Sequence, residues 1–133
     1  MKRIDDKVQV SGQVRPEEIA RLGVAMIVNN RPDGEEPGQP TSDEVEAAAR
    51  AAGIDYRHIP MAGGLSLPLI AQMADALAAA EGEVLAFCKS GTRSTYLWAL
   101  ARSRMGDDAE ELVSKAAAAG YDLSPIRTLL AQG

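Results

Sequence analysis

Cysteine and histidine are nearly absent from this sequence of 133 residues, which contains one of each, Cys88 and His58. A single cysteine cannot form an internal disulfide bond. One cysteine and one histidine also leave too few soft ligands for a structural zinc site, so we expect no metal. The lone thiol is therefore either a small apolar group in the core or a reactive group.

Long apolar runs and an excess of positive charge are missing as well. No apolar stretch approaches the length that spans a bilayer, and residues 1–6 lack the apolar core of a signal peptide, so we expect a cytoplasmic protein. The formal net charge is −5 and the pI is about 4.9, whereas nucleic acids and anionic membranes attract basic proteins. We expect neither of these partners, and no cofactor.

The apolar content, 46% of the residues, is sufficient for a single domain over residues 1–133 with a sizeable core. Apolar or alternating segments predict strands at residues 7–10, 24–28, 54–59 and 84–87. A helix is predicted over residues 94–105, with leucines spaced along one face. Prolines and capping residues predict further helix starts near Pro16, Thr41, Ser66, Asp107 and Ser124. Strands that alternate with helices imply an α/β fold with a mainly parallel central sheet of about four strands, flanked by helices.

The chain is organised around residues 84–95. An apolar strand runs into a loop that begins with Cys88 and ends with Arg93, and a helix rich in hydroxyl groups follows directly. Backbone N–H groups at a helix N-terminus bind anions, and the helix dipole and a nearby arginine both favour the thiolate over the thiol. The stretch therefore predicts a cysteine nucleophile that faces a small anionic substrate or a phosphorylated protein.

The residues of this loop have distinct expected roles. Gly91 permits a tight turn that points amides inward, and the planar guanidinium of Arg93 can hold two oxygens of a phosphate, sulfate or thiosulfate group. Ser94 can donate a hydrogen bond to the thiolate or reprotonate a leaving sulfur. The expected catalytic residues are Cys88, Arg93 and Ser94, and the expected anion-binding residues are Lys89, Ser90, Gly91, Thr92 and, from a distant loop, Arg31.

The distant loop, residues 29–40, follows a predicted central strand at the sheet edge where open α/β folds place their ligands. Its Arg31 can bind substrate oxygens, or it can form an ordinary ion pair with Asp33 or Glu35. Asp33 is a possible general acid, although an acid in a Pro-Asp-Gly segment usually just makes the turn. His58 has no visible partner, and we interpret it as structural or exposed rather than catalytic.

The sequence from Phe87 to Ser94 resembles the active-site loop of cysteine-dependent phosphatases and of rhodaneses. Through the patterns at residues 10–13, 28–36 and 58–60, the wider chain is similar to a bacterial family formerly of unknown function, the phosphatase-like domain of beta-lactamase-hydrolase-like proteins. That family is related to dual-specificity and tyrosine phosphatases and also occurs joined to metallo-β-lactamase-like sulfur enzymes. The resemblance implies a dual-specificity-phosphatase-like fold and a cysteine-dependent phosphatase that hydrolyses phosphate esters.

Three features depart from the phosphatase pattern. Four residues separate Cys88 from Arg93 where phosphatases carry five, Phe87 stands where they usually have histidine, and residues 61–64 contain no aspartic acid to protonate a leaving alcohol. Sulfur transfer needs no such acid, because sulfite leaves as an anion. The alternatives are therefore a sulfurtransferase that passes a Cys88 persulfide to an external thiol acceptor, and an anion-binding or redox-sensing module without turnover.

Overall fold

The computed structural model describes residues 1–132, whose middle layer is a five-stranded sheet in the order β1-β2-β5-β3-β4. The strands are β1 (Lys2–Arg3), β2 (Val8–Ser11), β3 (Met26–Asn29), β4 (Asp55–His58) and β5 (Val84–Phe87). Strands β2, β5, β3 and β4 run parallel and β1 is antiparallel to β2, so the predicted mainly parallel sheet is confirmed. The edge strand β1 was not predicted, because its two residues are too few to show the alternation that indicates a strand.

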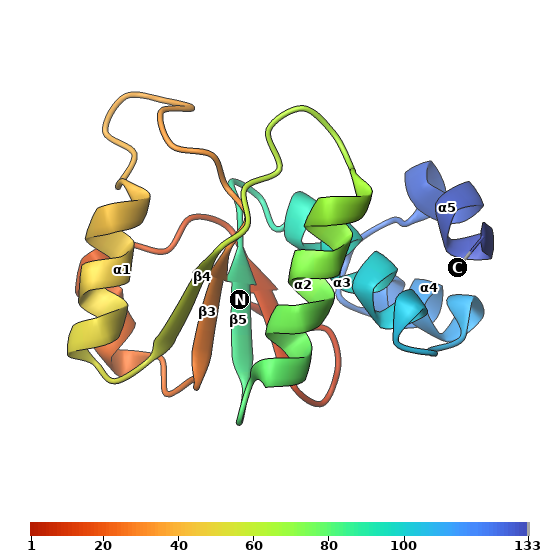
Figure 1. Ribbon diagram of the computed structural model, residues 1–133, viewed down its shortest axis with the longest axis horizontal. Helices are drawn as coiled ribbons and strands as arrows, with labels where there is room; N and C mark the ends of the chain where they lie inside the picture. The colour runs from red at the N-terminus through yellow and green to blue at the C-terminus, as the bar shows by residue number, and fades with distance from the viewer. Residues whose placement is uncertain (133) are drawn as a thin grey trace.

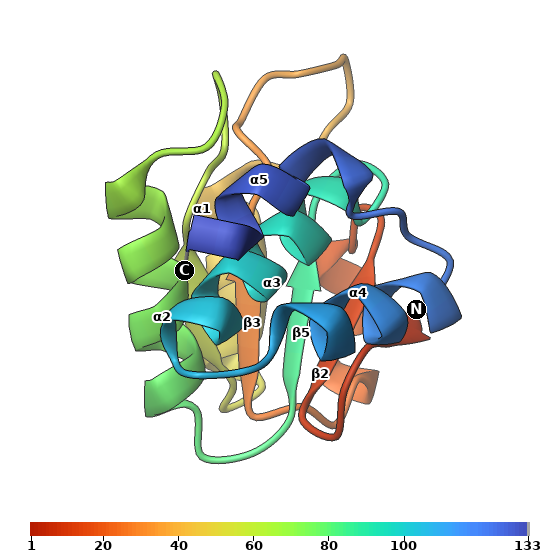
Figure 2. The same cartoon turned by 90° about the vertical axis from the view of Figure 1, so that its right-hand side faces the viewer.

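Helices cover both faces of the sheet (Figures 1 and 2). One face carries η1 (Pro16–Arg21) and α1 (Ser42–Ala51). The other carries α2 (Leu67–Ala79), α3 (Thr92–Arg104), α4 (Ala109–Ala118), η2 (Ser124–Ile126) and α5 (Arg127–Gln132), which stand in front of the sheet in Figure 2. Over the described part of the chain, no helix combines the length and the apolarity that crossing a bilayer requires.

The helix starts follow the sequence with two differences. The predicted caps at Thr41 and Ser66 are confirmed, since each side chain accepts a hydrogen bond from the backbone N–H three residues on. Helix α3 begins at Thr92, two residues earlier than predicted, because Gly91 is its N-cap. The predicted capping residue of α4, Asp107, is wrong by one position: Asp108 caps the helix, and Asp107 instead binds Arg102 at 2.9 Å.

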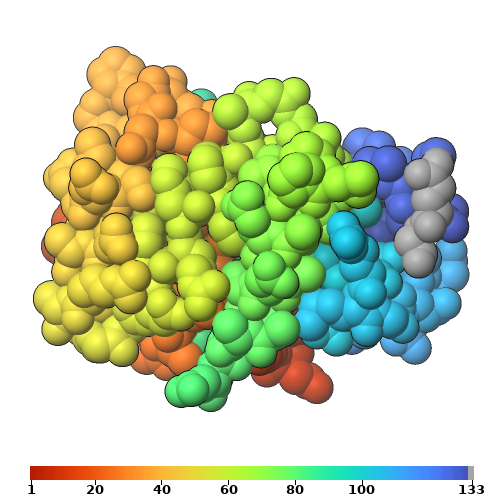
Figure 3. Space-filling view, viewed as in Figure 1, coloured from red at the N-terminus to blue at the C-terminus, as the bar shows by residue number. Residues whose placement is uncertain are grey.

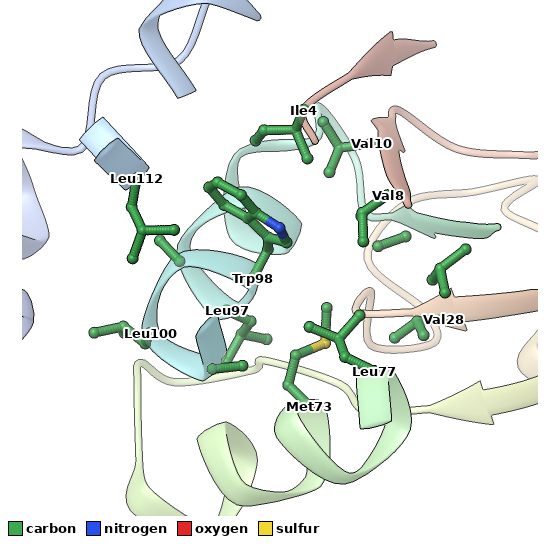
Figure 4. Close-up of a cluster of buried hydrophobic side chains, with 14 of the residues drawn as sticks. Ile4, Val8, Val10, Val28, Met73, Leu77, Leu97, Trp98, Leu100 and Leu112 are labelled. Atoms are coloured by element: carbon green, nitrogen blue, oxygen red, sulfur yellow. The ribbon is translucent and has the colours of Figure 1, made fainter. Parts of the chain in front are cut away.

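Alternation along the central strands divides the core between the two faces. On β5, Val84 and Ala86 pack in the cluster beneath α2, α3 and α4, while Leu85 and Phe87 pack in the cluster with α1 and η1. Trp98 of α3 is fully buried in the first cluster (Figure 4). Its indole N–H donates to Asp5 at 2.8 Å. This packing fixes α3 against the sheet and so fixes the loop that precedes it.

The carboxyl ends of the four parallel strands lie at one edge of the sheet. The register pairs Phe87 with both Ser11 and Asn29, and it pairs Asn29 with His58. The four loops that follow these strands therefore meet at that edge, which is the upper edge in Figure 1. They comprise residues 12–15, 30–41, 59–66 and 88–91. Ligand sites in open parallel sheets form at this edge.

Candidate functional site

Cys88 lies directly after β5 and is fully buried. Its backbone N–H donates to the carbonyl of Ser11 at 3.3 Å, and its Sγ accepts a hydrogen bond from the backbone N–H of Gly91 at 3.0 Å. Gly91 has a φ of 91°, in the left-handed region that favours glycine. The loop therefore folds back over the sulfur and directs one amide at it.

Several amides of this loop are free to bind a ligand. Among residues 1–132, the backbone N–H groups of Lys89, Ser90, Arg93 and Ser94 find no acceptor. The last two belong to the first turn of α3, where helix amides lack an intrahelical partner and the helix dipole is positive. Free amides around a sulfur at a helix N-terminus suit an oxyanion.

Arg93 adds a guanidinium group that is held at one edge and open at another. Its Nη1 and Nη2 donate to the two carboxylate oxygens of Glu35 at 2.8 and 2.9 Å, and Nη1 also donates to the carbonyl of Met61 at 3.2 Å. Nε–H and the second N–H of Nη2 have no oxygen or nitrogen acceptor within the described residues. These two donors share one edge of the guanidinium, and they match two oxygens of a tetrahedral anion.

Glu35 is the carboxylate that positions this arginine. The hydrogen bonds from Arg93 lower the pKa of Glu35 to about 2, and the same contacts raise the pKa of Arg93 above its ordinary value. At neutral pH Glu35 is therefore ionised, so it serves as a hydrogen-bond acceptor and cannot donate a proton to a leaving group.

Arg31 also binds Glu35, at the carboxylate oxygen Oε1 that accepts from Nη2 of Arg93. Its side chain is only 2% exposed, and its Nε donates to Glu35 at 2.9 Å, its Nη2 to Glu36 at 2.8 Å and its Nη1 to Gln13 at 2.9 Å. Of the two roles that the sequence suggested, the structure contains the ion pair with Glu35. Lys89 lies at the rim, with its Nζ 3.8 Å from Glu36.

Ser94 directly follows Arg93 in the sequence, but its hydroxyl binds away from the sulfur. Its hydroxyl donates to Oδ1 of Asn30 at 2.7 Å, and Nδ2 of Asn30 donates to the carbonyl of Ile59 at 3.0 Å. Both Ser94 and Asn30 are fully buried. In this arrangement the sulfur is hydrogen-bonded by Gly91, and Ser94 instead ties the start of α3 to the ends of β3 and β4.

Asp33, in the loop of residues 30–41, and His58, the last residue of β4, are also engaged away from Cys88. Asp33 accepts a hydrogen bond from the backbone N–H of Ser42 at 2.8 Å, at the start of α1. Nε2 of His58 lies 3.0 Å from the carbonyl oxygen of Arg31, a contact that fits the structural interpretation. Within the described chain, no three His, Cys, Asp or Glu side chains come together in a way that would hold a metal.

Three residues that sequence reasoning did not select as site residues belong to this region: Asn30, Glu35 and Tyr121. The Tyr121 hydroxyl donates to the carbonyl of Ser90 at 3.0 Å. Asn30 follows a central strand, so its place at the carboxyl edge was a usable signal. Glu35 and Tyr121 lie 58 and 31 residues from their partners in the loop, and no local pattern connects them.

The loops around the site leave a hollow in the molecular surface. In the space-filling view a notch separates the loop of residues 30–41, in orange, from the loop of residues 59–66, in lime green (Figure 3). The first loop supplies Glu35, and the second supplies the carbonyl of Met61, so both loops that border the notch contact Arg93.

Known proteins match this chain in sequence. The sequence model of a family described as "Beta-lactamase hydrolase-like protein, phosphatase-like domain" matches residues 1–105. The "Beta-lactamase hydrolase-like protein" of Xylella fastidiosa is 41% identical over an alignment of 134 positions. The alignment covers 96% of this chain and 31% of that protein. The chain thus spans about a third of the length of this curated relative.

Solved structures match the fold. A candidate phosphatase from Neisseria meningitidis, known from a crystal structure, is 30% identical with a TM-score of 0.82, over 98% of this chain and 96% of that one. The crystal structure of Tk-PTP in its active form gives a TM-score of 0.70 at 18% identity, over 98% and 92% of the two chains, which is a likeness of fold alone. The predicted dual-specificity-phosphatase-like fold is confirmed.

Proposed function

The chain belongs to the family described as "Beta-lactamase hydrolase-like protein, phosphatase-like domain", and on this premise we propose that it is a cysteine-dependent hydrolase of phosphate esters. The observation that carries the proposal is the convergence of three groups at one sheet edge. These are the sulfur of Cys88, the free amides of its loop and the open edge of Arg93. The substrate is a small phosphorylated molecule or a phosphorylated protein.

In the first step the thiolate of Cys88 attacks phosphorus. An S–P bond forms while the P–O bond to the leaving group breaks, and the leaving oxygen takes the electron pair. The loop amides, which include those of Lys89 and Ser90, and the open edge of Arg93 bind the three equatorial oxygens, which supports the proposed transition state electrostatically. Water then attacks phosphorus, releases inorganic phosphate and regenerates the thiolate.

The leaving group receives little help from the protein in this mechanism. Glu35 is ionised, and Asp33 is engaged at the start of α1, where its Oδ1 accepts a hydrogen bond from the amide of Ser42. General acid catalysis typically contributes about two to four orders of magnitude in rate. The geometry therefore supports phosphate esters of acidic alcohols, such as aryl phosphates, over alkyl phosphates.

A sulfurtransferase is the second candidate function, and a specific observation favours it. The loop has four residues between Cys88 and Arg93, and residues 59–66 contribute a carbonyl but no carboxylate to the site. In this reaction the thiolate attacks the outer sulfur of thiosulfate, the S–S bond breaks, and sulfite leaves with the electron pair. An external thiol, or cyanide in an assay, then takes the outer sulfur from the Cys88 persulfide.

One pair of assays separates the two reactions. The purified protein is incubated with an aryl phosphate and, separately, with thiosulfate and cyanide, and released phosphate and thiocyanate are measured. Phosphate release that is lost in Cys88→Ser supports the proposal, and thiocyanate alone overturns it in favour of sulfur transfer. Turnover retained in Cys88→Ser contradicts both enzymatic functions.

The same variant tests the third possibility, a module that binds anions without turnover. Cys88→Ser removes the nucleophile and keeps the amides and Arg93, so phosphate should still raise its melting temperature. If the unaltered protein gains the same thermal shift but releases neither product, it is an anion-binding module and the proposed function is wrong.

A further inference from the structure

Tyr121 lies outside the region that the family model matches, yet it reaches the cysteine loop. It follows α4 through a complete Schellman motif: Gly120 has a φ of 95°, its N–H donates to Ala117 at 3.0 Å, and the N–H of Tyr121 donates to Ala116 at 2.8 Å. This helix stop turns the chain back and sets the backbone of Tyr121. Its side chain then contacts the loop between Cys88 and α3.

Tyr121 contacts the same peptide group that donates a hydrogen bond to the sulfur of Cys88. The Tyr121 hydroxyl donates to the carbonyl oxygen of Ser90, and the N–H of the same Ser90–Gly91 peptide donates to Sγ of Cys88, each at 3.0 Å. In a trans peptide the carbonyl oxygen and the N–H point in opposite directions. One rigid peptide plane is therefore held by Tyr121 on one side and by the sulfur on the other.

We propose that Tyr121 is a positioning residue for the Cys88 thiolate. By fixing the carbonyl of Ser90, it keeps the N–H of Gly91 aimed at the sulfur, and it polarises that N–H, because hydrogen bonds in a chain strengthen one another. The peptide is thereby a stronger donor to a negative sulfur than to a neutral thiol. This role rests on the proposed function only in requiring that Cys88 acts as a thiolate.

The fit around this contact is close. A Cβ at position 91 would lie 2.2 Å from the Tyr121 oxygen, so the loop admits glycine alone at the point where the ring approaches. On the other side of the loop, a Cβ at Gly12 would lie 2.8 Å from the carbonyl oxygen of Lys89. The cysteine loop is thus held between the segment after β2 and the segment after α4.

The charged and titratable groups near the sulfur are few. Arg93 on α3 and Tyr121 after α4 both interact with the charge of Cys88, while Lys89, next in the chain, is directed to Glu36. Burial and then the charge of Cys88 raise the pKa of Tyr121 above its ordinary value. The hydroxyl therefore stays protonated, and remains a donor to Ser90, over the pH range in which a thiol ionises.

The test is the titration of Cys88 in Tyr121→Phe, which keeps the ring and removes the hydroxyl. Because the chain holds a single cysteine, a carbon-13 label in cysteine gives one NMR signal that follows the ionisation of this thiol. We expect the midpoint of the titration to move up by about half to one pH unit, the size of one net hydrogen bond. The matched control is Tyr96→Phe on α3, which should leave the midpoint unchanged.

A midpoint in Tyr121→Phe equal to that of the unaltered protein overturns the proposal, and so does an equal shift in Tyr96→Phe. The failure of the proposed function looks different. If Cys88 of the unaltered protein is still a thiol at neutral pH, the nucleophile is missing, whereas the difference between the two variants still decides the role of Tyr121. Gly120→Ala supplies a second variant, since strain at its positive φ displaces Tyr121 and should move the midpoint in the same direction.

Discussion

The cysteine loop, residues 88–91, and the loop of residues 30–41 lie at the same edge of the sheet, but they differ in whether their polar groups have partners. In the second loop Arg31, Glu35 and Glu36 are all engaged in ion pairs, and Arg31 is buried. In the cysteine loop the amides of Lys89 and Ser90 lack acceptors within the described residues, and Arg93, in the first turn of the helix that follows, keeps one edge of its guanidinium open. A region with satisfied groups holds its neighbours in place, whereas a region with free donors binds a ligand.

This difference predicts that the largest loss of activity follows from removing the open edge of the Arg93 guanidinium. Arg93→Lys keeps the positive charge, but an ammonium cannot bind Glu35 through two nitrogens and also present two parallel donors to an anion. We expect kcat/KM for an aryl phosphate to fall by about two to three orders of magnitude, as for the loss of a main transition-state donor. Steady-state kinetics at neutral pH measures the effect.

The matched control for this variant is Arg102→Lys on the same helix. Arg102 binds Asp107 with Nε and Nη2, at 2.9 and 3.0 Å, and makes no contact with the cysteine loop. This control should lose some stability and keep its kcat/KM. If Arg93→Lys stays within about threefold of the unaltered protein, the open edge has no part in the reaction, and the comparison between the loops loses its functional meaning.

A smaller effect is expected from loosening the loop that holds Arg93. Glu35→Gln removes the charge that fixes the guanidinium and leaves only one carbonyl oxygen as an acceptor. We expect kcat to fall by about tenfold with a smaller change in KM, since the misplaced Arg93 matters most in the transition state. Glu36→Gln is the control, because Glu36 contacts Arg31 and Lys89 but not Arg93; equal losses in the two variants would refute the special role of Glu35.

The contrast between the loops also explains what could be predicted from the sequence. The strand, the cysteine and Arg93 all lie within residues 84–93, so local rules on strands, glycine turns and helix starts were sufficient to predict the order of strand, loop and helix there. Ser94 was predicted to bind the sulfur, but its hydroxyl donates to Asn30, which lies 64 residues away in the sequence and belongs to another loop.

The support of the loop could not be predicted. The contact between Arg93 and Glu35 depends on the path of a long loop, and that of Tyr121 with Ser90 depends on how α4 packs on α3. Both are long-range contacts that carry no periodicity in the sequence. The fold class was predictable, because strands alternate with helices throughout the chain, and the helix caps were predictable to within one or two residues.

The smallest expected effect concerns stability and pH. Because the pKa of Glu35 is near 2 in the folded protein and ordinary in the unfolded chain, its ion pairs stabilise the fold fully above about pH 4.5, and this stabilisation is lost as the pH falls toward 2. After screening by solvent, we expect about 1 kcal/mol of this to disappear between pH 6 and pH 3. Urea unfolding of the unaltered protein and of Glu35→Gln at these two pH values isolates the contribution.

The difference in unfolding free energy between the two proteins should be larger at pH 6, since the amide introduced by the substitution does not titrate. A difference that stays constant would mean that Arg93 and Arg31 do not stabilise the ionised carboxylate. The loop of residues 30–41 would then not support the cysteine loop through these ion pairs.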